Sequence, residues 1–455
     1  IVDGLKRLKV PETAASLVSL LALLVPIQMA GQTWDDHDRS GRYTCRDFGQ
    51  NYLNSMDAKG NPVIFTNGDN DTFPLWYNQE TEGVRTDARV CNLSYLQTDW
   101  YIDQMRRPAY DSPSLPISWT RLQYVTGTRE GIPVQPDALQ QVIDYYKDSP
   151  EDLKQMLGDN PYELKNIIRH WVLNDNPDLQ IFPTDSIVVT VDKEAVKRSG
   201  MMIAADSIPD VMHISLKGKR AIYKSEMMML EMISQANWER PLYMSTTVGP
   251  DNYGHLGDNF VQEGLACRIT PFDTKQSGRT IDSERMYNNM MNKFKYGGLK
   301  ENPDIYLDET VIRMCYTHRR LFNQLAQQLL KEGQKDKALK VLQRAEEEIP
   351  GSIVPHEAFY GHSLELADAW LALGHKAEAE KLLNAVGQNA REYIEWYLSL
   401  NTQRLLQSSR ECLMQIYILN DIAKTWEPID KKKAETYRME VNNYASRCHQ
   451  RGMSL

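Results

Sequence analysis

The stretch from Thr13 to Trp34 is the feature that most constrains this chain, because no ionisable side chain interrupts it. A cationic segment precedes it at residues 6–9, and the acidic sequence WDDHD follows at residues 34–38. A helix of about 20 apolar residues is long enough to cross the ~30 Å hydrocarbon core of a bilayer. We therefore predict a transmembrane helix within residues 1–33, with the cations in the cytoplasm and everything after Trp34 outside.

Two other interpretations of this stretch stay open. A signal peptide would share the cationic start and the apolar centre, although Gln28 stands where a small residue is wanted two positions before Ala30. A helix buried in a soluble core would also be apolar, and Pro26 would then lie near its end. The chain begins with Ile1, so we expect it to be the tail of a longer protein.

The rest of the chain has the composition of an ordinary folded protein. Of its 455 residues, 25% are charged and 42% hydrophobic, which excludes a disordered or fibrous chain and a polytopic membrane protein within these limits. The formal net charge of −9 gives no reason to expect a nucleic-acid partner. The six cysteines form no Cys-x-x-Cys pair, so we expect no zinc site. They are interpreted as scattered buried thiols, although an even number is also compatible with an oxidising compartment.

Residues 34–309 alternate strand and helix patterns in the way that is typical of an α/β domain. The first unit has strands at 62–66 and 88–96, with a helix that ends at Gly83 between them. A second unit is predicted from a strand at 211–216, a helix at 223–236 and a strand at 241–248. The methionine-rich spacing in that helix favours burial against a sheet over an exposed binding face. We expect a parallel or mixed, Rossmann-like sheet.

After Thr310 the sequence is helical throughout and contains a repeat. Ala326 and Gly333 match the tetratricopeptide frame, in which small residues let two antiparallel helices approach and glycine ends the first helix. Ala367 and Gly374 match it again, 41 residues later instead of roughly 34, so the segment 351–361 is predicted to be an insertion. We expect an all-α, tetratricopeptide-like array over residues 310–455.

Two acidic loops form the candidate polar site. The first contains Asp35, Asp36, His37, Asp38 and Arg39, and the second contains Asp69, Asn70 and Asp71 directly after a predicted strand. Ligands of open α/β sheets bind at the carboxyl ends of strands, and carboxylate and amide oxygens suit a divalent cation. In the alternative interpretation, Asp69, Asp71 and Thr72 cap the next helix and tie the turn, while Asp38 pairs with Arg39. We expect no cofactor other than this candidate cation.

Longer strings in the sequence point to a family. They are WDDHDRSGRY at 34–43, GDNDTFPLWY at 68–77, NWERPLYMSTTV at 237–248 and EGLACRITPF at 263–272. With these strings the chain resembles the post-membrane portion of a bacterial family of large polytopic membrane proteins. That family is grouped with protein O-mannosyltransferase-like enzymes of the GT-C type. The resemblance covers the chain from about Ala14 to the repeats.

The resemblance implies a membrane-bound glycosyltransferase whose lipid-linked sugar donor and catalytic carboxylate belong to a membrane bundle upstream of this sequence. No catalytic residue is therefore expected here, and the fragment is not expected to be active alone. Its soluble part would lie in the periplasm, next to the bacterial inner membrane, and would recognise a protein or peptide acceptor through the helical repeats or support the bundle.

Two rival functions stay open. One is a membrane-anchored periplasmic tetratricopeptide scaffold for protein–protein interaction, without catalysis. The other is a soluble metal-dependent glycosyltransferase that uses Asp69, Asn70 and Asp71.

Overall fold

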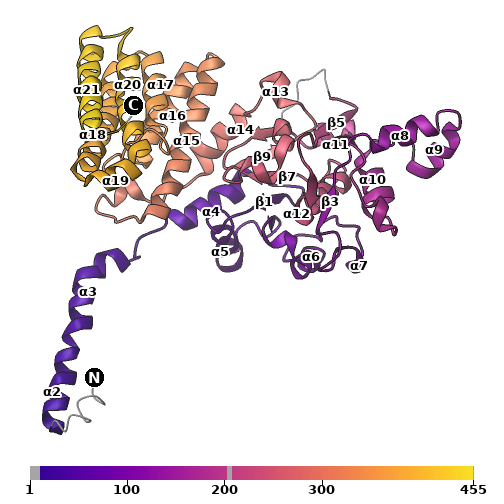
Figure 1. Cartoon of the computed structure of the whole chain (residues 1–455), viewed down its shortest axis with the longest axis horizontal. Helices are drawn as coiled ribbons and strands as arrows, with labels where there is room; N and C mark the ends of the chain where they lie inside the picture. Colours follow the sequence, from indigo (N-terminus) through magenta and orange to yellow (C-terminus); the bar gives the residue numbers. More distant parts are fainter. Residues whose placement is uncertain (1–10, 202–207, 454–455) are drawn as a thin grey trace.

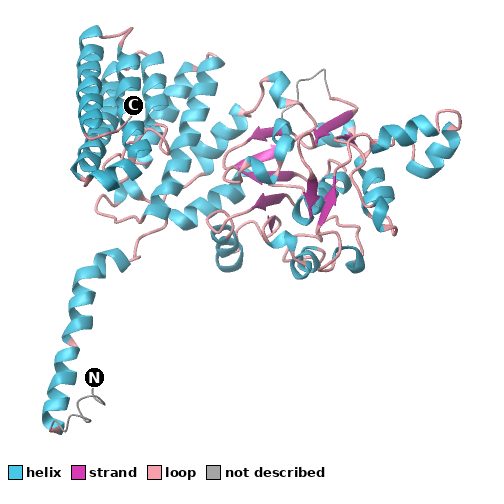
Figure 2. Cartoon of the chain, in the orientation of Figure 1, coloured by secondary structure: helices cyan, strands magenta, loops and turns pink. Residues whose placement is uncertain are grey.

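The computed structural model of the chain describes residues 11–201 and 208–453. Figure 1 shows a projecting N-terminal helical segment, a body that contains the strands, and a stack of helices that ends at the C-terminus. The strands lie in the middle of the body, with helices around them (Figure 2). The chain therefore combines a mixed sheet with many helices, which agrees with the predicted combination of an α/β region and a helical region.

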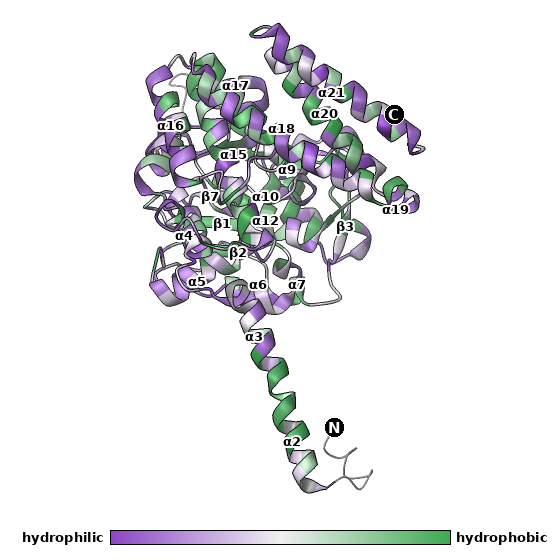
Figure 3. Ribbon diagram, turned by 90° about the vertical axis from the view of Figure 1, so that its left-hand side faces the viewer, coloured by the Kyte–Doolittle hydropathy of each residue, from purple (hydrophilic) through white to green (hydrophobic). Residues whose placement is uncertain are grey.

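The N-terminal segment consists of helices α2 (Glu12–Ala22) and α3 (Leu24–His37), which meet at Leu23. The window Ser16–Trp34 is long and apolar enough to cross a membrane, and none of it is buried in the rest of the chain. Its apolar colouring runs along most of the projecting segment (Figure 3). A helix buried in a soluble core does not fit this exposure. The cations predicted to precede the span, Lys6, Arg7 and Lys9, lie outside the described residues.

The central sheet has five strands in the order β2-β1-β7-β9-β8. Strands β1 (Val63–Thr66), β2 (Arg89–Asn92) and β7 (Leu242–Ser245) run parallel to one another, with β1 between the other two. Strands β9 (Ala266–Ile269) and β8 (Phe260–Gln262) continue the sheet in antiparallel pairs. Helix α5 (Phe73–Glu82) connects β1 to β2, so the first predicted strand–helix–strand unit is confirmed.

The second predicted strand–helix–strand unit is wrong. Strand β5 (Val211–Ser215) pairs in antiparallel fashion with β4 (Ser186–Thr190) in a separate two-stranded sheet and does not join β7. Its residues alternate between covered and exposed, whereas β1 and β7 are buried along their whole length. A strand covered on one face suits an antiparallel ribbon, and a strand inside a parallel sheet is covered on both faces. A third small sheet pairs β3 (Gly131–Pro133) with β6 (Ala221–Tyr223).

Alternate residues of the central strands face two different hydrophobic clusters. Ile64 and Tyr243 belong to the cluster that contains α4 (Thr44–Ser55), and Phe65 and Met244 belong to the cluster that contains α12 (Lys224–Gln235). The methionines of α12 are almost fully buried, which confirms a helix packed in the core. Shorter helices complete the body: α6 (Asp99–Met105), α7 (Arg121–Tyr124), α8 (Ala138–Tyr145), α9 (Pro150–Leu157), α10 (Leu164–Ile167), α11 (Lys193–Arg198), α13 (Thr274–Ser277) and α14 (Ser283–Asn288).

The C-terminal part is built from successive helices that pack in pairs. They are α15 (Glu309–Lys331), α16 (Lys335–Glu348), α17 (Ser363–Ala372), α18 (Lys376–Ser399), α19 (Thr402–Gln407), α20 (Ser409–Trp426) and α21 (Lys431–Gln450). Gly333 and Gly374 follow the first helices of two pairs with φ of +74° and +84°, a conformation in which a Cβ would be strained. Ala326, Ala338, Ala367 and Ala379 are fully buried, as close helix packing requires.

The helices after residue 309 share their hydrophobic core with the body. Phe48 and Leu53 of α4 belong to the same buried cluster as Phe322 and Leu325 of α15. A polar contact reinforces this junction, because the Nδ2 of Asn51 lies 2.9 Å from the Nε2 of the buried His318. The central sheet and the C-terminal helices are thus coupled through α4 and α15.

Candidate functional site

The first acidic loop lies at the end of the projecting helix. Asp35, Asp36 and His37 belong to the last turn of α3; the side chains of Asp35 and Asp36 lie outside what the structure describes. Asp38 ends the helix, and its Oδ1 accepts hydrogen bonds from the amide and the hydroxyl of Ser40. These bonds, the hydroxyl first, lower the pKa of Asp38. Arg39 pairs with Asp308 at 3.6 Å, so it contacts the start of α15 instead of the second loop.

The second acidic loop places its three residues differently. Asp69 and Asn70 are exposed at the turn after β1, whereas the side chain of Asp71 is buried. The Oδ1 of Asp71 accepts the amide of Gly68 at 2.9 Å, which closes the turn. Its Oδ2 accepts hydrogen bonds from the hydroxyls of Ser245, at 2.9 Å, and Thr247, at 2.7 Å. Asp71 therefore ties the carboxyl end of β1 to the carboxyl end of β7.

A hydroxyl cluster surrounds this carboxylate. The phenol oxygen of Tyr52 lies 3.0 Å from the hydroxyl oxygen of Ser245 and 3.1 Å from the hydroxyl oxygen of Thr247. Burial, followed by the nearby charge of Asp71, raises the pKa of Tyr52 to about 12. Thr72 stands at the N-cap of α5, and its side chain makes no capping bond. The buried carboxylate thus joins a turn to a strand, and the amides of α5 are not its partners.

A cation role for the second loop stays a prediction. Within residues 11–201 and 208–453, no three His, Cys, Asp or Glu side chains form a group that could hold a metal ion. Asp69 and Asn70 offer two exposed oxygen-bearing side chains, and Asp71 already accepts three hydrogen bonds. A divalent cation here would have to compete with those bonds or take most of its ligands from water.

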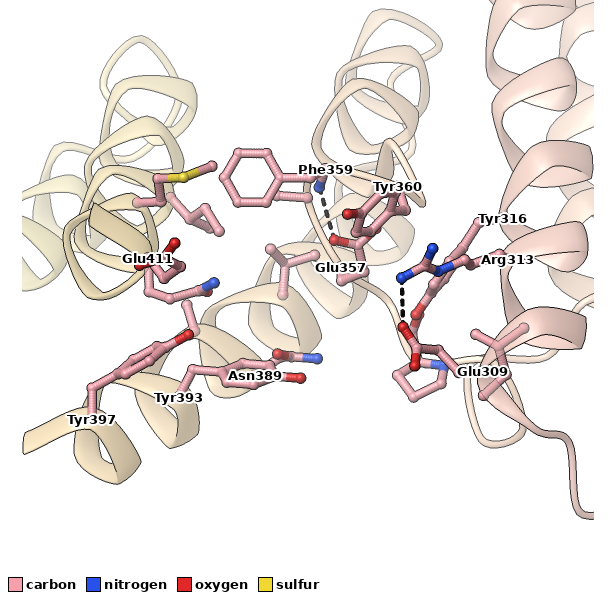
Figure 4. A pocket seen from close by; sticks show the side chains of 18 residues that line it. Glu309, Arg313, Tyr316, Glu357, Phe359, Tyr360, Asn389, Tyr393, Tyr397 and Glu411 are labelled. Carbon is pink, nitrogen blue, oxygen red and sulfur yellow. Dashed lines mark hydrogen bonds and ion pairs between the residues drawn. The ribbon is translucent and has the colours of Figure 1, made fainter. Parts of the chain in front are cut away.

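A large groove lies among the C-terminal helices, and the sequence analysis did not identify it. It encloses about 510 Å³ between α15, the inserted segment that follows α16, α18 and α20. Figure 4 shows side chains from these four elements pointing into one space. Five aromatic residues line it: Tyr316, Phe359, Tyr360, Tyr393 and Tyr397.

One wall of the groove is internally bonded. Arg313 pairs with Glu309 at 2.5 Å, and its guanidinium lies 5.6 Å from the ring centre of Tyr360. The Glu357 carboxylate accepts the amides of Phe359, at 2.9 Å, and Gly361. These contacts hold the side chains of this wall in place before any ligand arrives, as a preformed binding surface requires.

The opposite wall offers free polar groups. Within the described part of the chain, the side-chain amide of Asn389 has no hydrogen-bond partner, and it points into the groove beside Tyr393 (Figure 4). Glu411 lines the same side from α20. An amide with a free donor and a free acceptor can pair with the backbone of an extended peptide, while the phenol rings contact its side chains.

Arg319 holds the inserted segment in place. Its side chain is fully buried, and its guanidinium donates to the carbonyls of Ile349, Val354 and Pro355 at 2.9–3.0 Å. The predicted insertion therefore forms a wall of the groove. The irregular repeat spacing and the aromatic run at 393–397 were the sequence signals for it, but neither signal shows that the two segments meet.

A second polar cluster lies under the sheet. Glu263 is fully buried; its Oε2 accepts the hydroxyl of Tyr243 at 3.0 Å, and its Oε1 has no hydrogen-bond partner. Arg268 and Arg285 both pair with Asp57 and lie 3.8 and 3.6 Å from Glu263. Burial outweighs the two guanidinium charges and raises the pKa of Glu263 to about 7. A polar hollow of about 620 Å³ adjoins the cluster.

Comparison with known families gives one match that spans the sheet. The family model described as TMEM260-associated domain 2 matches residues 45–289, which is more than half of the chain. The match contains the second acidic loop, the hydroxyl cluster and Glu263, and it lies between the projecting helices and the C-terminal stack. No curated protein and no solved structure matches the chain.

Proposed function

The chain belongs to the family of the TMEM260-associated domain 2, and from this we propose that it is the extracytoplasmic part of a membrane-bound, protein O-mannosyltransferase-like glycosyltransferase. TMEM260 is an O-mannosyltransferase-like protein, which supports a relation to glycosyl transfer. The role of this part is to hold the protein acceptor, and the observation that carries the role is the aromatic groove of the C-terminal helices.

The groove supports a peptide ligand through its shape and its lining. Paired helices of tetratricopeptide type stack into concave surfaces that bind extended peptides. The helix pairs here, with buried alanines and left-handed glycines at their turns, fit that description. Phenol rings and the free amide of Asn389 suit a polypeptide better than a small apolar molecule.

The proposed division of labour follows from the position of the apolar helix. The segment Ser16–Trp34 crosses the bacterial inner membrane, and the residues after it lie in the periplasm. A membrane bundle binds the lipid-linked sugar donor and supplies the catalytic carboxylate. The acceptor is a protein or peptide segment that carries Ser or Thr, and the groove holds it on the same side of the membrane as the donor sugar.

A photo-crosslinking experiment tests acceptor binding. A benzoylphenylalanine in place of Tyr393, inside the groove, should crosslink to secreted or periplasmic proteins that carry O-linked sugars. The same group in place of Tyr417 is the matched control, because Tyr417 is also an exposed tyrosine of this stack but does not line the groove. Equal crosslinking at both positions would contradict the proposal.

The same groove would also serve a protein–protein scaffold without catalysis. Glycoproteomics of a deletion strain distinguishes that scaffold from a transferase. Loss of Ser/Thr-linked glycans, restored by the native gene but only weakly by Asn389→Ala with Tyr393→Ala, supports acceptor recognition by a transferase. An unchanged glycan profile together with lost protein complexes would favour the scaffold.

A further inference from the structure

We propose that an aromatic face formed by α5, the short 3-10 helix Tyr95–Gln97 and α6 lies in the headgroup layer of the membrane that the N-terminal helix crosses. The aromatic face consists of Phe73, Trp76, Tyr77, Tyr95 and Trp100. The inference rests on the proposed function in one respect, namely that the segment Ser16–Trp34 spans a membrane.

Four rings of this face, those of Phe73, Trp76, Tyr95 and Trp100, form a continuous series, and Tyr77 is exposed on the same helix as the first two. The ring centres of Phe73 and Trp76 are 5.7 Å apart, and Trp76 stacks on Tyr95 at 6.1 Å with an angle of 10° between the planes. Tyr95 in turn lies 6.0 Å from Trp100. The exposed fraction is 46% for Phe73 and Tyr77 and 55% for Trp100. Such a contiguous exposed series of large rings marks an interaction surface.

The face is on the side of the body from which the N-terminal helix leaves. In Figure 1 and in the view turned by 90° in Figure 3, α5, α6 and α7 form the lower edge of the body, and α3 projects below that edge. Helices α5 and α6 pack inward through buried residues such as Leu75, Ile102 and Met105. Their exposed rings consequently face solvent, and the helices that carry them lie at the edge of the body that would face a membrane crossed by α2 and α3.

The chemistry of the rings suits the headgroup layer. Tryptophan and tyrosine concentrate at the membrane interface, because an apolar ring and a polar N–H or O–H are both satisfied there. On the same edge, Leu122 of α7 is 80% exposed, which adds an apolar group. The net charge of −9 gives no general attraction to anionic lipid, so the rings themselves must provide the contact, and zwitterionic lipid should suffice.

Tryptophan quenching in a membrane tests the proposal with the full 455-residue chain. The protein is reconstituted into phosphatidylcholine nanodiscs in which a fraction of the lipid carries a nitroxide on its headgroup. The quenched share of the emission is compared between the native chain and three Trp→Phe variants. Trp34→Phe reports the spanning helix and Trp100→Phe reports the aromatic face. Trp396→Phe is the matched control, because Trp396 is 54% exposed on α18 and Trp100 is 55% exposed.

The expected result is that Trp34→Phe and Trp100→Phe each remove part of the quenched emission, whereas Trp396→Phe removes only unquenched emission. If Trp34 is quenched and Trp100 is not, the helix spans the membrane and the aromatic face does not touch lipid. The face would then be free for another ligand, such as an oligosaccharide, and the proposal is overturned while the proposed function stands. If Trp34 is not quenched either, the N-terminal helix does not span the membrane, and both the proposed function and the membrane contact of the aromatic face are contradicted. Thermal melts of each variant check that the fold is retained.

Discussion

The carboxylate of Asp71 shows how much a single buried residue of the second acidic loop contributes to the body. It accepts one amide and two hydroxyls from two strand ends, whereas the side chain of Asp69 lies in solvent. Removing a buried acceptor leaves its donors unpaired and costs about 1–3 kcal/mol. We expect Asp71→Ala to lower the free energy of unfolding by this amount and Asp69→Ala to change it by less than about 0.5 kcal/mol. Urea denaturation in detergent measures both, and equal losses would contradict this assignment.

The sequence predicted that Asp69 and Asp71 belong together, but it could not separate their roles. The two residues are two positions apart in the same loop, so pattern and spacing treat them alike. What distinguishes them is Ser245 and Thr247, which are more than 170 residues away in the chain. A long-range contact of this kind leaves no local signal in the sequence.

Glu263 should make stability depend on pH. Burial raises its pKa to about 7, while the unfolded chain titrates near the usual value of about 4.3. The folded state therefore binds more protons between these values. The stability contributed by this carboxyl is complete at low pH and is lost as the pH rises to 7. We expect Glu263→Gln to make the slope of the unfolding free energy against pH more positive between pH 5 and 7, because the falling contribution of this carboxyl is removed. Glu284→Gln, at an exposed position beside the same hollow, should leave that slope unchanged.

His318 acts in the opposite direction. Burial lowers its pKa to about 3, so the folded state resists protonation of the ring as the pH falls below about 6.5. Its contribution is complete at neutral pH and is lost on acidification. The two ranges overlap between about pH 4.3 and 6.5, so the two contributions offset each other there and together give a broad stability plateau. Glu263→Gln removes the falling contribution, so the maximum should move toward higher pH. A maximum that stays in place would contradict the opposing roles.

At the scale of elements, the packing of α4 against α5 depends on one glycine. A Cβ at Gly49 would lie 2.3 Å from the carbonyl oxygen of Pro74, so the two helices could not keep their distance. We expect Gly49→Ala to destabilise the fold by several kcal/mol, since rigid backbone must move. Gly31→Ala is the matched helical control, because nothing lies within 4 Å of its Cβ position. There alanine should be neutral or raise helix content. Similar melting temperatures for both variants would contradict the close contact.

Local patterns predicted the elements better than their pairing. The strands at 63–66, 89–92 and 242–245 and the helix between the first two follow the apolar runs and the loop signals. The predicted partner of β5 was wrong, because the order of strands and helices along the chain does not determine which strands share a sheet. The alternation of apolar and polar residues from Met212 to Ser215 was the available clue to a strand covered on one face.

At the scale of the whole molecule, the shared core makes the C-terminal helices necessary for the body. Phe48 of α4 is buried in the same cluster as Leu321 and Phe322 of α15. A chain that ends at residue 309 would expose this surface and lose the contact between Asn51 and His318. We expect that truncation to abolish cooperative thermal unfolding. A chain that lacks only α21 should keep it, because α21 packs mainly on α20. Independent cooperative unfolding of residues 1–309 would contradict the shared core.

The sequence predicted a change from alternating strands and helices to helices alone near residue 310, and it predicted the apolar helix before Trp34. It did not predict that α4 and α15 would join the two regions, because their contact surfaces are ordinary amphipathic faces. The groove was missed for the same reason: its walls come from segments up to about a hundred residues apart.

The inserted segment held by Arg319 has a consequence for how this molecule could diversify. Its anchoring carbonyls are at Ile349, Val354 and Pro355, while the side chains that reach the groove, Glu357, Phe359 and Tyr360, follow the last anchor. The tip can therefore be exchanged without altering the helices that it bridges. Related chains could acquire new preferences by replacing a few neighbouring codons, much as an antibody changes its antigen by changing a loop.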